Sequence, residues 1–106
     1  MKKINLAKMA SIVRSKNAGP FLLTLDVIFK DRDAFYLAKD SKILTKETIA
    51  DLYDVSIENV ISVYFFEPAH AWKATIVRPV PSGSFGDADV YGAQQHEPLF
   101  QISFPS

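Results

Sequence analysis

Cysteine is absent from all 106 residues. Its absence excludes disulfide bonds, thiolate catalysis and thiolate metal sites, and it is compatible with a reducing cytosol. Net charge is absent too, because twelve Lys and Arg residues balance twelve Asp and Glu residues. A balanced chain has no overall field that would attract nucleic acid or an anionic membrane. Binding to nucleic acid or to a membrane is therefore not expected.

Long hydrophobic runs are also missing, and no segment is long enough to cross a bilayer. The amino-terminal residues carry the charges of a signal peptide, but Asn5 and Lys8 interrupt its apolar core. We therefore expect a soluble, cytoplasmic protein. The 48% hydrophobic content is that of a globular protein with a real core, and the length fits one domain over residues 1–106.

Hydrophobic periodicity and capping residues predict the secondary structure. Alternating apolar residues over 21–29 indicate a strand, while Asn5, Asp31 and Thr45 are suitable N-caps for helices. The predicted helices cover 5–14, 32–40 and 46–53, with one further turn over 56–59, and the predicted strands cover 21–29, 60–66, 72–77 and 99–104. This order predicts an α+β fold, a two-layer sandwich with helices on one face of a small, mainly antiparallel or mixed sheet.

A long Gly/Pro-rich loop is predicted between Arg78 and His96, because the segment keeps neither the helical nor the strand period. It holds three of the four glycines. Loops of this length in small domains are usually functional or disordered. Within it, Ser82 and Ser84 flank Gly83, in a small-residue turn whose N–H and hydroxyl groups could hold a phosphate or carboxylate. The turn matches neither the P-loop nor the dinucleotide fingerprint.

The same segment contains the side chains best suited to moving a proton. Asp87, Asp89 and His96 could offer oxygen and nitrogen ligands to a divalent ion, but closely spaced carboxylates more often form turns. We therefore predict no metal and no other cofactor. His96 titrates near neutrality and follows Gln95, so an acid–base role is slightly favoured there. For His70, an exposed or hydrogen-bonded histidine is preferred.

A group of donors between residues 14 and 20 has two interpretations. Arg14, Lys16, Gly19 and Pro20 are typical of the carboxyl end of a helix, where cations suit the dipole and Pro forbids continuation. Arg14, Lys16 and Asn17 also offer guanidinium, ammonium and amide donors that would suit an anionic substrate. The sequence leaves these interpretations evenly balanced.

Three motifs resemble the domain-of-unknown-function family 4387: Ser15–Phe21, Phe66–Ala69 and Arg78–His96. That family has no settled activity. What the resemblance implies is association, because its members are commonly encoded beside, or joined to, proteins similar to the acyclic terpene utilisation family. Those proteins occur in catabolic clusters that handle branched acids or acyl-CoA. The resemblance therefore implies a large partner subunit and a small carboxylate or acyl-CoA substrate.

The first hypothesis is the small subunit of a two-component catabolic enzyme, which acts by hydration, dehydration or carbon–carbon lysis. His96 or Asp89 would be catalytic. The substrate would be bound by Arg14, Lys16, Asn17, Arg78, Ser82, Ser84 and Gln95. The alternative is a non-catalytic module that stabilises or regulates a large partner, and an independent small-molecule binder ranks third. Homo-oligomerisation stays open.

Overall fold

The computed structural model of the protein describes residues 3–19, 21–77 and 97–105. Short 3-10 helices, labelled η, join some of its strands and helices. In chain order the elements are β1 (Lys3–Asn5), α1 (Leu6–Met9), β2 (Ala10–Gly19), β3 (Leu22–Phe29), α2 (Arg32–Ser41), α3 (Lys46–Tyr53), η1 (Ile57–Asn59), β4 (Val60–Phe66), η2 (Glu67–Ala69), β5 (Ala71–Val77), η3 (Glu97–Gln101) and β6 (Ser103–Pro105).

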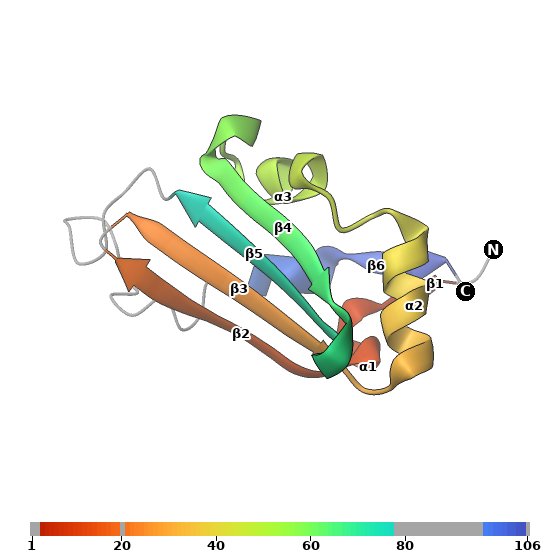
Figure 1. Cartoon of the computed structure of the whole chain (residues 1–106). Helices are drawn as coiled ribbons and strands as arrows, with labels where there is room; N and C mark the ends of the chain where they lie inside the picture. The colour runs from red at the N-terminus through yellow and green to blue at the C-terminus, as the bar shows by residue number, and fades with distance from the viewer. Residues whose placement is uncertain (1–2, 20, 78–96, 106) are drawn as a thin grey trace.

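The main sheet has four strands in the order β2-β3-β5-β4, and every neighbouring pair is antiparallel. A second, two-stranded sheet pairs β1 with β6 and so joins the two ends of the chain. Figure 1 shows α2 and α3 on one side of the main sheet, together with the β1–β6 pair. The predicted α+β class is confirmed. The predicted Gly/Pro-rich loop lies outside the described residues.

Strand β3 is the centre of the hydrophobic core, and its pattern follows from the sequence. Its residues alternate between half-buried and buried, which places Leu23, Leu25, Val27 and Phe29 on the face that the helices cover. From the neighbouring strand β5, the indole of Trp72 enters the same core and is fully buried. The alternation of apolar residues therefore identified this strand.

The two longer helices begin where their capping residues predict. The Asp31 carboxylate accepts a hydrogen bond of 2.8 Å from the Ala34 N–H at the start of α2. The Thr45 hydroxyl accepts one of 3.3 Å from the Thr48 N–H at the start of α3. Each bond satisfies a donor that the first turn of a helix leaves unpaired.

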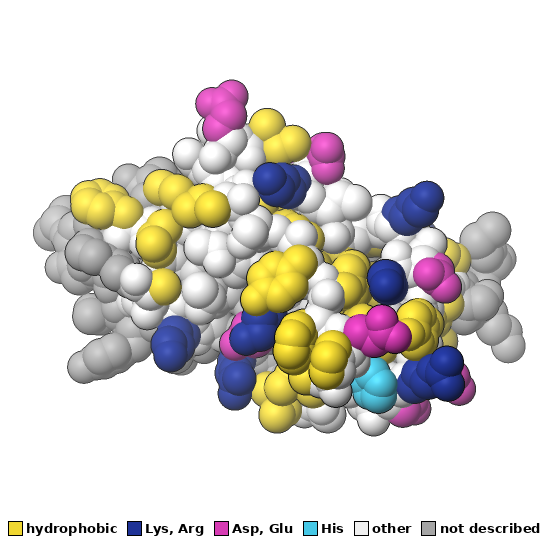
Figure 2. All heavy atoms as spheres, viewed as in Figure 1, with side chains coloured by type: hydrophobic (Ala, Val, Ile, Leu, Met, Phe, Trp, Pro, Cys, Tyr) yellow, Lys and Arg dark blue, Asp and Glu magenta, His cyan; other side chains and the backbone are white. Residues whose placement is uncertain are grey.

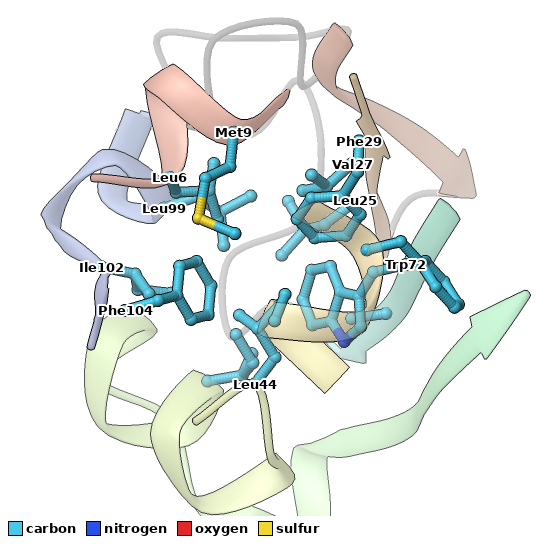
Figure 3. Packing of buried hydrophobic residues seen from close by; sticks show 14 of the residues in the cluster. Leu6, Met9, Leu25, Val27, Phe29, Leu44, Trp72, Leu99, Ile102 and Phe104 are labelled. Carbon is cyan, nitrogen blue, oxygen red and sulfur yellow. The ribbon is translucent and has the colours of Figure 1, made fainter. Parts of the chain in front are cut away.

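Side chains from both ends of the chain complete the core. Figure 3 shows Leu6 and Met9 of α1 facing the side chains of Leu99, Ile102 and Phe104, with strand β3 on the other side. The backbone supports this contact, because the Leu6 N–H donates a 3.0 Å hydrogen bond to the Ile102 carbonyl. The β1–β6 pair is therefore part of the folded unit.

The predicted helix over residues 5–14 is wrong beyond its first turn. Asn5 does cap a helix, since its side chain accepts a hydrogen bond from the Ala7 N–H, but α1 ends at Met9. From Ala10 the chain is extended and pairs with β3 along its length. Residues 14–19 therefore do not end a helix, because they lie on strand β2, and Pro20 lies outside the described residues.

The last predicted strand, over residues 99–104, is only partly correct. Glu97–Gln101 forms the 3-10 helix η3, which places Leu99 in the core, and the strand β6 covers Ser103–Pro105. Strand β1 was not predicted at all. A three-residue strand carries too little alternation to be recognised without its partner.

Candidate functional site

Among the described residues, no helix or strand covers the face of the main sheet opposite α2 and α3, and polar side chains collect on it. Strand alternation places Thr24 and Asp26 of β3 on this face, because Leu23 and Leu25 point to the core. Lys73 and Thr75 of β5 lie beside them by the register of the two strands. We call this surface the open face.

One row of neighbouring residues across the open face is charged at its centre. Arg14, Asp26, Lys73 and Tyr64 lie side by side on β2, β3, β5 and β4. The Arg14 Nε lies 3.1 Å from one oxygen of Asp26, and the Lys73 Nζ lies 3.5 Å from the other. The Asp26 side chain is 18% exposed, against 58% for Arg14 and 42% for Lys73. One carboxylate therefore serves two cations in this charged row.

The next row, toward the end of the sheet where β5 finishes, carries three hydroxyl groups. Lys16, Thr24, Thr75 and Ser62 are neighbours across the same four strands. The Thr24 hydroxyl donates a 3.1 Å hydrogen bond to the Lys16 carbonyl, so its oxygen can still accept. Within the described part of the chain, Lys16 has no carboxylate partner at ion-pair distance. We call these four residues the hydroxyl row.

A groove of about 270 Å³ runs across both rows. Figure 2 shows Lys and Arg side chains gathered with an acidic side chain on the strand side of the molecule, beside hydrophobic side chains. The two rows together carry three cations and one carboxylate. The lining of the groove comes from all four strands and consists of Lys16, Ala18, Thr24, Asp26, Tyr64, Lys73, Ala74 and Thr75. This groove has the charge and the hydroxyl groups to hold a carboxylate or phosphate.

An apolar row borders the charged row on its other side. Ile12, Ile28, Ala71 and Phe66 are neighbours across the four strands. The two outer members are the most accessible, since Ile12 is 43% exposed and Phe66 is 46% exposed. Exposed apolar residues that gather beside polar ones are typical of surfaces that bind other proteins.

The structure brings together two of the predicted substrate-binding residues and separates a third. Arg14 and Lys16 share the open face, because they are two positions apart on strand β2. Asn17 pairs with Leu23, so it lies on the helix-covered side of the sheet. The other predicted site residues lie outside the described part of the chain: Arg78, Ser82, Ser84, Asp89, Gln95 and His96.

Sequence reasoning missed the two residues that complete the charged row, Asp26 and Lys73. The signal was present, because each is the one charged residue of its strand. Thr24 and Thr75 lie two positions from them, and so on the same faces. What the local sequence could not supply was the register that places Asp26 beside Lys73.

The turn between β4 and β5 contacts the helix α2 through Glu67 and His70. The Tyr36 hydroxyl of α2 donates a hydrogen bond to the Glu67 carboxylate, which raises the pKa of Tyr36. The His70 ring instead packs against Phe35, with 5.6 Å between ring centroids. Glu67 therefore links α2 to the hairpin, and this corner reads as structural.

Neither a metal-binding cluster nor a membrane-spanning helix is found among the described residues. Among residues 3–19, 21–77 and 97–105, no three His, Asp or Glu side chains converge as they would to hold a metal ion. None of the helices in this part of the chain has the length and apolar character needed to span a bilayer.

The fold and the groove define a small α+β protein with an open antiparallel face that is suited to anions. Residues 6–103 match the model of the family described as a domain of unknown function, DUF4387. The chain belongs to this family. Neither a curated protein nor a solved structure shows a significant match. Its function must therefore be argued from the residues themselves.

Proposed function

We propose that the chain is the small subunit of a two-component catabolic enzyme and that its open face holds the anionic group of a carboxylic acid or acyl-CoA substrate. The observation that carries this proposal is the excess of cations, with Lys16, Arg14 and Lys73 around the single carboxylate of Asp26. Partially exposed cations in a groove bind anions with modest energy, and neighbouring hydroxyl groups add direction.

Each cation has a distinct part in this proposal. Lys16 supplies the charge that no described carboxylate neutralises. Within the described residues, Arg14 bonds Asp26 through its Nε, and in this proposal its two terminal nitrogens donate to the ligand. Lys73, a member of the charged row, lines the groove and would contact the ligand from the β5 side. Asn17, on the other side of the sheet, is left out of the proposed site.

The connection to the predicted catalytic residues also supports this assignment. Strand β5 ends at Val77, which pairs with Leu22 next to the hydroxyl row. The segment with Arg78, the serines and His96 follows directly in the sequence. In the proposed mechanism the groove binds the anionic end of the substrate, and Asp89 or His96 moves the proton in a hydration, dehydration or carbon–carbon lysis. Arg78, Ser82, Ser84 and Gln95 would complete substrate binding.

The proposed partner is a large protein of the acyclic terpene utilisation type, and the first experiment co-expresses the two chains. Size-exclusion chromatography with light scattering would reveal a stoichiometric complex, which would then be assayed on branched hydroxy acids and their CoA esters. Lys16→Ala is expected to raise the KM about tenfold with little change in kcat, as loss of uniform substrate binding does. Lys46→Ala, on the exposed surface of α3, is the matched control.

A second function is favoured by the apolar row. Ile12 and Phe66 would be covered if the open face were a docking surface for the large partner, which is what a non-catalytic stabilising module requires. His96→Asn separates the two functions. For a catalytic subunit, turnover collapses while the complex survives, and for a stabilising module the activity follows complex formation alone. Separate elution of the two chains at micromolar concentration, with and without ligand, would refute both.

A further inference from the structure

The main sheet has two edge strands, and only one of them is protected by charge. Strand β2 carries Arg14 and Lys16, whereas β4, with the sequence Val-Ile-Ser-Val-Tyr-Phe-Phe, has no charge, proline or glycine. Within the described part of the chain, β4 has no strand beyond it. An apolar edge strand without charges is a template for pairing with another strand, because its outer N–H and C=O groups remain unpaired.

The side chains of β4 also leave apolar surface exposed at this edge. Ile61 is 50% exposed, Tyr64 48% and Phe66 46%. On the side of the helices, Val63 and Phe65 pack against the core but stay half-buried. Their counterparts on the inner strand β5, Ala74 and Trp72, are buried completely. The core is therefore incomplete along β4.

We infer that β4 pairs antiparallel with β4 of a second copy, which makes one continuous eight-stranded sheet. The distribution of charge on the two edge strands favours a second copy of the chain as the partner of β4. Self-pairing of β2 would bring the cations of two copies together, and like charges across strands destabilise a sheet. Self-pairing of β4 brings no charges of the strand together. Pairing β2 of one copy with β4 of the next would leave free edges and form an open chain of copies.

The register of the dimer follows from the bulge at the start of β4. The pairing with β5 shifts between Val60 and Ser62, so the regular part of the strand is Ser62–Phe66, with Tyr64 at its middle. A symmetric antiparallel pair of this stretch places Tyr64 opposite the second copy's Tyr64, and Val63 opposite its Phe65. The aromatic pair and the extended core are the contacts that stabilise such a pair.

The symmetry also fixes where the grooves lie. Two antiparallel copies of one strand are related by a two-fold axis perpendicular to the sheet, so both open faces point to the same side. Tyr64 lines the groove as well as the edge. The dimer therefore carries two anion grooves side by side, one on each side of the axis. This inference does not depend on the proposed function.

Sedimentation equilibrium of the full chain from about 1 to about 100 µM tests the dimer. We expect reversible self-association. Tyr64→Lys and Tyr64→Glu should each self-associate only at a concentration at least about tenfold higher than the wild type, because each variant places two like charges directly opposite each other in the dimer. Their equimolar mixture should form a heterodimer close to wild-type affinity, detected by native mass spectrometry with one copy tagged. Ile12→Lys is the control, with similar exposure on the opposite edge strand.

Several outcomes would overturn the inference. A wild-type chain that stays monomeric up to about 100 µM excludes the dimer, and this holds even if β4 binds the large partner. A dimer that persists in both Tyr64 variants, or dissociates in Ile12→Lys, excludes this edge as the interface. If circular dichroism shows that a Tyr64 variant is unfolded, Phe66→Lys at the end of the same stretch replaces it. Failure of the mixture to associate would exclude the Tyr64-centred register.

Discussion

Replacing Asp26 with Asn should make the protein less stable and, at the same time, a better binder of anions. Asn has the same shape but no charge, so the change removes both ion pairs without opening a cavity. An exposed pair contributes roughly 0.2–1 kcal/mol. Asp26 makes two, at 3.1 and 3.5 Å, to side chains that are 58% and 42% exposed. We expect a loss of about 1 kcal/mol in the free energy of unfolding, which shrinks as salt screens the pairs.

The gain in anion binding follows from the same carboxylate. The two rows carry three cations and one carboxylate, so Asp26→Asn raises their net charge by one unit. At about 4 Å in a water-like dielectric, one unit charge changes the binding energy by about 1 kcal/mol. That energy corresponds to about fivefold tighter binding of a monovalent anion. If Asp26 serves only to hold the sheet together, its loss lowers the free energy of unfolding and leaves the affinity for anions unchanged.

Urea unfolding at two salt concentrations measures the stability, and an NMR titration with inorganic phosphate at constant ionic strength measures the binding. The amide signals of Lys16, Lys73 and Thr75 should move, and they should saturate at lower phosphate concentration in Asp26→Asn. The control Asp51→Asn makes the same change of charge on α3. Equal or weaker phosphate binding in Asp26→Asn would refute the groove. An equal gain in Asp51→Asn would show that only the overall charge matters.

Two further predictions concern the packing that holds the sheet in place. Burial raises the pKa of Tyr53, so the unfolded chain loses this proton first and stability should fall above pH 10. In Tyr53→Phe the free energy of unfolding, measured by urea titration, should fall less steeply with pH, by up to about 1.4 kcal/mol per pH unit, and an unchanged slope would contradict it. Phe104→Ala should lower the free energy of unfolding by about 3–5 kcal/mol, because Phe104 is fully buried, while the exposed Phe100→Ala should cost far less; equal losses would exclude β6 from the core.

Local sequence identified the parts of the fold that depend on neighbouring residues. The alternation in β3 and the caps Asp31 and Thr45 need only a few adjacent positions, and the structure confirms them. Strand β2 was wrongly predicted as part of a helix, because apolar residues before and within it also have the spacing of a helical stripe: Leu6, Met9, Ala10 and Val13. What makes Ala10–Gly19 extended is its pairing with β3, and this contact between separate segments leaves little local trace.

Sequence reasoning predicted the two cations of β2 but not their partners across the sheet. Arg14 and Lys16 were predicted to bind an anionic substrate, although the predicted helix ended at Arg14. On strand β2 they share one face, and this makes them a pair of cations. Asp26 and Lys73 are separated by 47 residues and meet only through the register of β3 and β5. Such a contact cannot be read from spacing, which is why the charged row was not predicted.

The strand order gives the open face and the β4 edge separate chemistry, and this separation can be tested within one molecule. Lys16 lines the groove on its β2 side and Arg14 lies beside it on the same strand, whereas Tyr64 belongs to both the groove and the edge. Phe66 belongs to the edge and the apolar row but does not line the groove. Loss of self-association in Phe66→Lys should therefore leave phosphate binding in place, whereas a substitution at Tyr64 changes both. A large partner that covers the open face of a dimer would meet two grooves at once, because the two-fold axis turns both to the same side.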